Sequence, residues 1–255
     1  AVTRDGALLH SANPDQPLAV GSAFKLGVLK ALRDEIDAGK RAWSDVAELT
    51  EADRSFPSGT LQTWPTGAPL TLHSLAALMI SISDNTATDT LIRVLGRTTI
   101  EDALGIAPVL TTRDLFTLKA EPELRTRYLA GDLDAQRQVL AELASRPLPN
   151  LSKVNTPYDP AMEWNLSATT LCQLIQSVSD LDVMHINPGV ANPADWQSVA
   201  FKGGSEIGVL NLTTLVTAKS GTRYCVAATW NSDTAVDQAK ATASYANLLA
   251  LLKRR

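Results

Sequence analysis

The secondary-structure pattern of the chain changes twice, and the order of these changes restricts the folds open to it. Residues 7–10 follow an Asp5-Gly6 turn and predict a strand near the N-terminus. From Ser22 to about residue 178, apolar residues recur mostly at helical spacing. Three segments rich in β-branched and aromatic residues come next, before a last helical pattern; they lie at 196–201, 209–217 and 223–230.

Strands at both ends imply one antiparallel sheet shared by the first and last segments, flanked by helices, with an all-helical subdomain inserted between them. We therefore predict an α/β chain of the α+β sandwich kind, folded as a single domain over residues 1–255. The sheet subdomain is expected at 1–21 plus about 180–255, and the helical subdomain at about 22–179. A cleft between two such parts is the expected place for a site.

The strongest helical patterns of the middle segment fall at 72–82, 86–95, 113–119 and 134–145. The last helix is expected at about 234–253, and its predicted buried face consists of Val236, Ala239, Ala243, Leu248 and Leu252. Gly203-Gly204 and the stretch from Lys219 to Thr222 are interpreted as the turns of the C-terminal meander.

Charge and composition exclude several classes of partner. The formal net charge of −4 gives no basic stripe for nucleic acid or for an anionic membrane surface. No apolar run approaches the length that spans a bilayer, so membrane insertion is not expected. Cys172 and Cys225 lack metal-ligand spacing and are interpreted as buried thiols, with a disulfide between them left open. We expect no metal and no organic cofactor.

Ser22-Ala-Phe-Lys25 stands at the predicted start of a long helix. One helical turn brings the Lys25 amine beside the Ser22 hydroxyl, where a lysine that has lost its proton can accept the serine proton. The helix N-terminus favours the negative charge that develops during such an attack. So short a motif also fits a capping serine followed by a surface lysine, and the pattern needs further support.

Ser83-Asp-Asn85 supplies that support, because it falls in a loop between two apolar helices. A second serine there can relay a proton to a leaving group, the Asn85 amide can hold a substrate carbonyl, and Asp84 can brace the loop. An ordinary N-cap cluster is the structural alternative.

The third element is Lys202-Gly-Gly-Ser205, near the end of a strand. The N–H of Ser205 can pair with that of Ser22 to form an oxyanion hole, and Lys202 would supply positive charge to Ser83 and to an anionic substrate. Lys219-Ser-Gly-Thr222 is the rival segment. We reject it because only one strand and the last helix follow it, which suits a hairpin turn.

In this order, the three elements resemble the Ser-x-x-Lys, Ser-Asp-Asn and Lys-Thr-Gly motifs of the class A β-lactamases and other penicillin-recognising serine hydrolases. The resemblance spans nearly the whole chain. It implies Ser22, Lys25, Ser83 and Lys202 as catalytic residues, and it implies a substrate-binding set of Asn85, Gly203, Gly204 and Ser205.

The chain departs from that family at three places. Gly203 stands where the family has a threonine, and the strand at 209–217 carries no arginine, so recognition of a β-lactam carboxylate should be weaker. Glu121-Pro-Glu-Leu-Arg125 resembles the family's Glu-x-x-Leu-Asn segment and suggests Glu121 as the deacylating base. Arg125 replaces the asparagine and is expected to pair with Glu121, with Glu163 as a substitute base.

The resemblance implies an acyl hydrolase that forms an ester at Ser22 and acts on β-lactams or carboxylic esters with weak turnover. A D-alanyl-D-alanine peptidase, a glutaminase and a β-lactam sensor without turnover are the alternatives. Small-molecule substrates are the expected partners. Family members usually have a helix and a first strand upstream, of which only a fragment fits before Ser22. Such late-starting sequences resemble the β-lactamase-like protein of clavulanic acid biosynthesis, in which a separate N-terminal domain comes first, and an additional domain before Ala1 stays open. An extracytoplasmic location is favoured by the family and a cytoplasmic one stays open.

Overall fold

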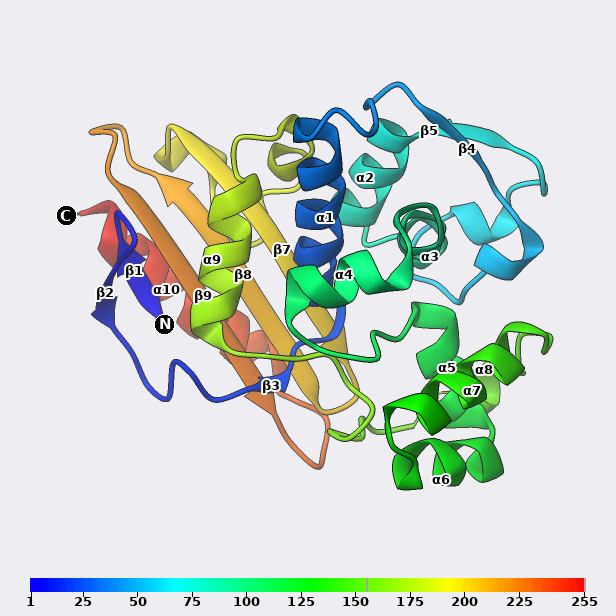
Figure 1. Ribbon diagram of the computed structural model, residues 1–255. Helices are drawn as coiled ribbons and strands as arrows, with labels where there is room; N and C mark the ends of the chain where they lie inside the picture. Colours follow the sequence, from blue (N-terminus) through cyan, green and yellow to red (C-terminus); the bar gives the residue numbers. More distant parts are fainter. Residues whose placement is uncertain (155, 255) are drawn as a thin grey trace. The chain divides into compact units, whose positions relative to one another are not determined.

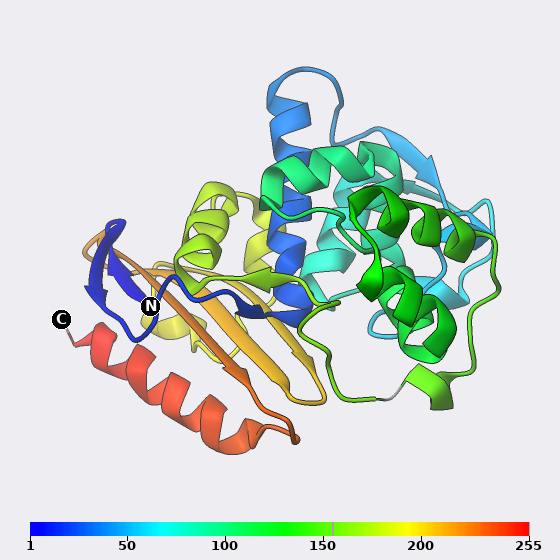
Figure 2. The same ribbon diagram turned by 60° about the horizontal axis from the view of Figure 1, so that its bottom comes forward.

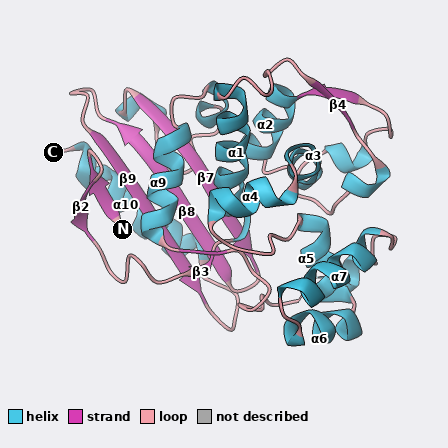
Figure 3. Cartoon of the chain, viewed as in Figure 1, coloured by secondary structure: helices cyan, strands magenta, loops and turns pink. Residues whose placement is uncertain are grey.

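The computed structural model describes residues 1–154 and 156–254 and divides into two compact units (Figure 1). Unit 1 consists of Ala1–Leu26 and Glu163–Arg255, and unit 2 is the continuous stretch Gly27–Met162. Helices and an antiparallel sheet together form the mixed architecture that the sequence predicts, so the fold class is confirmed (Figure 3).

Unit 1 is built on a five-stranded antiparallel sheet in the order β2-β1-β9-β8-β7. Its strands are β1 (Val2–Arg4), β2 (Ala7–His10), β7 (Ser198–Glu206), β8 (Val209–Thr217) and β9 (Arg223–Asn231). The N-terminal and C-terminal segments share this sheet as predicted, because Thr3 of β1 pairs with Cys225 of β9. A short second sheet joins β3 (Leu18–Ala19) to β6 (Asn165–Leu166).

The expected turn at Gly203-Gly204 is wrong. Both glycines lie inside β7, where Gly203 pairs with Leu212 and Gly204 with Asn211. The hairpin turn comes later, at Gly208, which has a φ of +87°. Glycines inside a strand often mark a place where another backbone approaches closely. The two glycines therefore reflect such an approach and not a turn.

Helices cover both faces of the sheet (Figure 2). On one face, α10 (Gln238–Lys253) buries Ala241, Tyr245, Leu249 and Leu252 against β8 and β9. Of the predicted face, Leu252 is buried and Val236 and Leu248 are partly buried against the same cluster, whereas Ala239 and Ala243 are exposed. The buried Tyr245 hydroxyl lies 2.8 Å from both Thr214 Oγ1 and Val226 O and fixes the rotation of the helix.

On the other face, α9 (Ala168–Val178) carries Cys172 against Cys225 of β9, and the two form a disulfide with a Cα–Cα distance of 5.8 Å. The interpretation as separate buried thiols is therefore wrong. Sequence spacing does not reveal which strand a helix packs against, and the pairing follows from that packing.

Unit 2 is mainly helical. Its α-helices are α2 (Leu72–Ser81), α3 (Asn85–Leu95), α4 (Arg97–Leu104), α5 (Thr112–Ala120), α6 (Pro122–Ala130), α7 (Leu133–Ala144), α8 (Leu151–Val154) and most of α1 (Lys25–Asp37). The four strongest sequence patterns correspond to α2, α3, α5 and α7. A hairpin of β4 (Val46–Glu48) and β5 (Pro69–Thr71) and two single turns, η2 (Glu51–Asp53) and η3 (Leu61–Thr63), complete the unit.

Across residues 1–154 and 156–254, no helix combines the length and the apolar character needed to cross a membrane.

We predict that the double substitution Cys172→Ala/Cys225→Ala lowers the free energy of unfolding by about 4 kcal/mol. The disulfide closes a loop with a sequence separation of 53 residues, and a cross-link of that length removes much entropy from the unfolded chain. Urea unfolding followed by circular dichroism measures the change. Cys172→Ala/Cys225→Ala unfolding at the same urea concentration as the parent would contradict the pairing.

Candidate active site

Ser22 and Lys25 lie at the junction of two helical types. Gly21–Phe24 forms a 3-10 turn, η1, and α1 begins at Lys25, so the long helix starts three residues later than Ser22. Ser22 is partly exposed and Lys25 is fully buried. The lysine side chain therefore stands in the interior, and the reading of Lys25 as a surface residue does not hold.

Trp164, which lies far from the Ser22-to-Lys25 motif in the sequence, holds η1 in place. The Trp164 indole stacks on the Phe24 ring with centroids 3.9 Å apart, and the Val20 N–H donates to Trp164 O at 3.1 Å. Stacked aromatic rings of this kind contribute beyond the area they bury. Phe24 and Trp164 are far apart in the chain, so sequence patterns do not reveal this contact.

Gly204 of β7 lies against the backbone of η1. A Cβ atom at Gly204 would come within 2.1 Å of Val20 O and 2.5 Å of Ser22 N. From the other side, a Cβ atom at Gly21 would lie 3.2 Å from Ser205 N. Only glycines allow this contact, which brings the backbone of η1 at Ser22 against the backbone of β7 at Ser205.

Lys202 precedes this contact on β7 and is 3% exposed. Its Nζ donates to Gly203 O at 2.6 Å. Burial lowers the pKa of Lys202 from 10.5 to about 7, because the interior disfavours the charged amine. Lys202 therefore exchanges its proton near neutral pH.

A buried polar network supports the same part of the sheet from β8. The Asn211 amide donates to Thr229 Oγ1 at 2.8 Å and to Ala228 O at 3.3 Å, and Thr213 Oγ1 donates to Asn211 Oδ1 at 2.9 Å. Asn211 pairs with Gly204 and Thr213 pairs with Lys202. The network fixes the two positions of β8 that face the Lys202-to-Gly204 segment, and sequence reasoning missed it.

The Ser83-to-Asn85 segment belongs to unit 2. Ser83 has a φ of +58°, which is unusual for a residue with a side chain. The buried Asp84 carboxylate accepts N–H bonds from Thr60 at 2.6 Å, Leu61 at 2.9 Å and Ala87 at 2.8 Å. Asp84 thus braces the loop as the sequence suggested.

Glu121 also belongs to unit 2, between α5 and α6. Its side chain is 38% exposed and lies 3.6 Å from Arg146. The expected pair between Arg125 and Glu121 is wrong, because Arg125 bonds Asp159 at 2.9 Å. Arg125 lies one helical turn after Glu121 on α6, but Asp159 from the segment after α8 takes its guanidinium.

The structure groups the predicted residues by unit. Ser22, Lys25 and the segment Lys202–Ser205 fall in unit 1, together with Glu163, which is 9% exposed. Ser83, Asn85 and Glu121 fall in unit 2. Lys219 lies in the turn after β8, where Ala218 N donates to Thr222 O at 2.8 Å, so it does not join the Ser22 group.

Comparison with known proteins assigns the chain. The sequence model of the β-lactamase enzyme family matches residues 3–250. The chain belongs to the β-lactamase enzyme family. It is a serine hydrolase of β-lactamase type. None of the curated proteins matches the sequence.

Solved β-lactamase structures share the fold. A β-lactamase from Sphaerobacter thermophilus is 24% identical, with a TM-score of 0.66, over 98% of this chain and 89% of that one. PBP-A is 20% identical, with a TM-score of 0.59, over 91% of this chain and 82% of that one. A β-lactamase from Chitinophaga pinensis is 18% identical, with a TM-score of 0.60, over 93% and 86% of the two chains.

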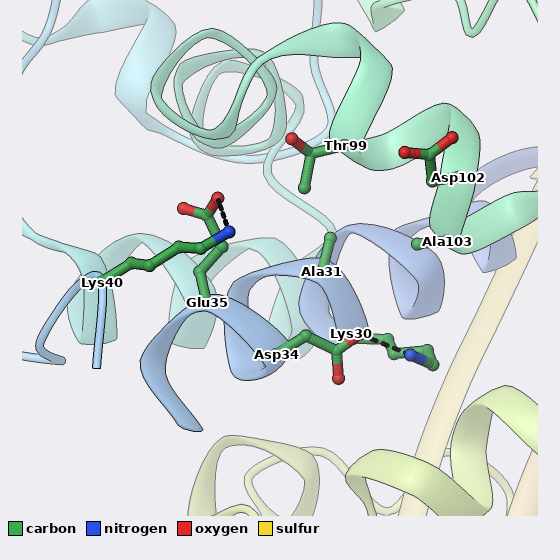
Figure 4. A pocket seen from close by; sticks show the side chains of 8 residues that line it. All are labelled: Lys30, Ala31, Asp34, Glu35, Lys40, Thr99, Asp102 and Ala103. Atoms are coloured by element: carbon green, nitrogen blue, oxygen red, sulfur yellow. Dashed lines mark hydrogen bonds and ion pairs between the residues drawn. The ribbon is translucent and has the colours of Figure 1, made fainter. Parts of the chain in front are cut away.

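Unit 2 of the protein described here also has a pocket of about 330 Å³, between α1 and α4 (Figure 4). Four of its charged side chains form ion pairs, Lys30 with Asp34 at 2.5 Å and Lys40 with Glu35 at 4.0 Å. Within the described residues, no group of three or more His, Cys, Asp or Glu side chains forms a metal-binding cluster.

We predict that Gly204→Ala lowers the free energy of unfolding by about 3 kcal/mol, because its methyl group would overlap Val20 O and Ser22 N. Gly203→Ala is the matched control. There, a Cβ atom would lie 2.9 Å from the tip of the Phe201 ring, which can move, and 3.0 Å from Asn211 O, a milder contact than the two at Gly204. Thermal unfolding should rank the variants parent, Gly203→Ala, Gly204→Ala; equal losses would refute the close approach of β7 to η1.

Lys202 should make stability depend on pH. The unfolded chain, with a lysine pKa of 10.5, binds more protons than the folded chain, with a pKa of about 7, so the free energy of unfolding rises with pH between these values. Lys202→Met should lose this rise in urea unfolding at pH 7, 8.5 and 10. Lys219→Met, in an exposed turn, should keep it. A Lys202→Met protein with the parental pH slope would show that the lysine is not buried.

Proposed function

We propose that this protein hydrolyses β-lactams or carboxylic esters through an acyl-enzyme at Ser22, with slow release of the acyl group. The observation that carries the proposal is the contact of Gly204 with η1, which brings the backbones that carry the Ser22 and Ser205 N–H groups close together. Two such donors stabilise the oxyanion of a tetrahedral intermediate.

Lys25 is the proposed acceptor of the serine proton. It lies one turn after Ser22 in the sequence and is fully buried, which suits an amine that takes the proton of a neighbouring hydroxyl. The serine Oγ then attacks the substrate carbonyl carbon, the C–N or C–O bond to the leaving group breaks, and the leaving group takes up a proton. Ser83 keeps the proton-relay role and Asn85 the carbonyl-binding role that the family motif suggests.

Lys202 is the proposed cation that attracts an anionic substrate. The fraction of Lys202 that carries charge falls as the pH rises through about 7. Affinity for an anionic β-lactam should therefore fall over the same range, while affinity for a neutral ester should not. Position 203 is a glycine and β8 has no arginine, so neither offers a side chain that could bind the carboxylate of a substrate.

We propose that deacylation is slow because the Glu121 carboxylate is paired with Arg146. This carboxylate is half-exposed, whereas Glu163 has both oxygens buried and belongs to the unit that contains Ser22. A base must be within reach of the water that attacks the ester. The engagement of Glu121 also favours a second candidate function, a β-lactam sensor that keeps its acyl group.

A variant of PBP-A, which shares the fold with a TM-score of 0.57, is described as an acyl-enzyme complex with penicillin G. We extend that chemistry to Ser22. Acylation of a serine by a lactam and by an activated ester differ only in the bond that breaks, so both substrates test the same nucleophile.

The test is intact-protein mass spectrometry over time with a chromogenic cephalosporin and with p-nitrophenyl acetate. We expect a mass gain that decays as product forms, and no gain in Ser22→Ala. Glu121→Gln and Glu163→Gln identify the base, because the variant that lacks it should keep its adduct at least tenfold longer. A persistent parental adduct would favour the sensor, and a gain that survives Ser22→Ala would end the proposal.

A further inference from the structure

Asp89 is a buried carboxylate in α3 that the proposed chemistry does not use. It is 3% exposed and lies one helical turn after Asn85. Its Oδ1 accepts the Thr112 N–H at 2.8 Å, and its Oδ2 accepts the Arg113 N–H at 2.9 Å and the Thr112 hydroxyl at 3.0 Å. Asp89 therefore joins α3 to the first turn of α5 within unit 2.

The start of α5 needs Asp89 for two of its backbone groups. The first four N–H groups of a helix have no partner inside the helix. Thr111 and Asp114 satisfy two of them, since the Thr111 hydroxyl accepts the Asp114 N–H at 3.0 Å and Asp114 Oδ2 accepts the Thr111 N–H at 2.9 Å. Asp89 accepts the remaining two, from Thr112 and Arg113, so all four are satisfied.

The Thr112 hydroxyl is the centre of a chain of oxygens. Besides Asp89 Oδ2, it lies 2.7 Å from Ser55 Oγ and 3.4 Å from Asn85 O. Ser55 is 2% exposed, so this chain is shielded from water. A hydroxyl carries one proton and can donate to only one of these neighbours at a time.

Residues 55–58 connect this chain to the other side of Asn85. Phe56 O accepts the Asn85 side-chain amide at 3.0 Å, and Ser58 O accepts the Asn85 N–H at 3.0 Å. The Phe56 ring also packs edge-on against Phe116 of α5, with centroids 5.4 Å apart. Thr112 thus holds the Asn85 carbonyl, and the segment that follows Ser55 holds its N–H and its side chain.

We propose that Asp89 and Thr112 are positioning residues for Asn85, and that protonation of Asp89 reverses the direction of the hydroxyl chain that ends at the Asn85 carbonyl. The effect on substrate rests on the proposed function, in which Asn85 holds the substrate carbonyl. The hydrogen-bond reversal itself does not.

The two protonation states use the same atoms differently. When Asp89 is ionised, its Oδ2 accepts the Thr112 proton, and Ser55 donates to Thr112. When a proton from solvent binds to Asp89 Oδ2, that oxygen donates to Thr112 Oγ1, and the Thr112 proton turns to Asn85 O or to Ser55 Oγ. Apart from the O–H bond that the added proton forms with Asp89 Oδ2, only the directions of hydrogen bonds change.

Both states are populated near neutral pH. Burial raises the pKa of Asp89 to about 7, the Arg113 and Thr112 N–H bonds oppose that rise, and the charge of Asp114 adds to it. The cations and acids of the neighbouring elements are engaged elsewhere: Arg97 with Asp114, Arg93 with Asp53, Glu101 with Arg137, and the Arg113 guanidinium with Arg54 O and Arg146 O.

Carbon-13 NMR on the full chain tests the reversal. The Asp89 carboxyl and the Asn85 carbonyl should titrate with one midpoint near pH 7 in the parent. Thr112→Val keeps the shape and the N–H but removes the hydroxyl, so Asp89 should still titrate and Asn85 should not. A parental Asn85 carbonyl that ignores pH, or one that titrates equally in Thr112→Val, overturns the proposal.

Thr117→Val is the matched control, because Thr117 is a buried threonine of the same helix whose hydroxyl donates only within α5, to Arg113 O at 2.7 Å. The Asn85 carbonyl of this variant should titrate as in the parent. Loss of the titration in both variants would attribute the effect to packing and overturn the assignment to Thr112.

Acylation rates separate the positioning role from a merely structural one. The Thr112→Val to Thr117→Val ratio of kcat/KM for p-nitrophenyl acetate should change about fivefold between pH 5.5 and 8.5, mainly through KM, since one neutral hydrogen bond is involved. A ratio independent of pH overturns the link to Asn85. Absence of acylation in every protein, with the NMR coupling present, would instead reject the proposed function.

Discussion

The contact between the η1 turn and strand β7 is the constraint on which unit 1 depends. Backbone meets backbone there, and the side chains that would normally separate a helical turn from a strand are absent at Gly21 and Gly204. The stacking of Trp164 on Phe24 and the hydrogen bond from Val20 hold η1 in this position. The disulfide, the network of Asn211 and the packing of α10 all stabilise the same sheet.

Unit 2 relies on a different device. Two aspartates of one short stretch, Asp84 and Asp89, are buried and are each bonded by N–H groups of segments distant in sequence. Removing a carboxylate from water is costly unless several donors compensate, and each aspartate has three. Hydrogen bonding, more than apolar packing, sets the shape of the loop that carries Ser83 and Asn85.

Sequence patterns predicted the fold class and the strongest helices because hydrophobic periodicity directly reflects which face is buried. They failed where distant partners decide the outcome. Gly203-Gly204 has the composition of a turn, yet its cross-strand pairs place it inside β7. Cys172 and Cys225 gave no sign of their pairing, since only the packing of α9 on β9 joins them.

The candidate site was accessible to sequence reasoning for a similar reason. Ser22, Lys25 and Lys202 belong to short motifs whose chemistry depends on local spacing. Asp89 belongs to no such motif, and its partners on α5 cannot be inferred from spacing. The pairing of Arg125 with Asp159 in place of Glu121 was equally hidden, because the fold, and not sequence spacing, decides which acid lies within reach of the arginine.

The division of the chain has a consequence for its synthesis on the ribosome. Unit 2 is continuous, so it can complete its contacts soon after Met162 emerges. Strand β1 precedes unit 2 in the chain and pairs with β9, which follows it, so β1 must wait until unit 2 and β9 have been made. During that interval the apolar side chain of Val2 has no sheet to cover it, and unpaired strands of this kind favour aggregation.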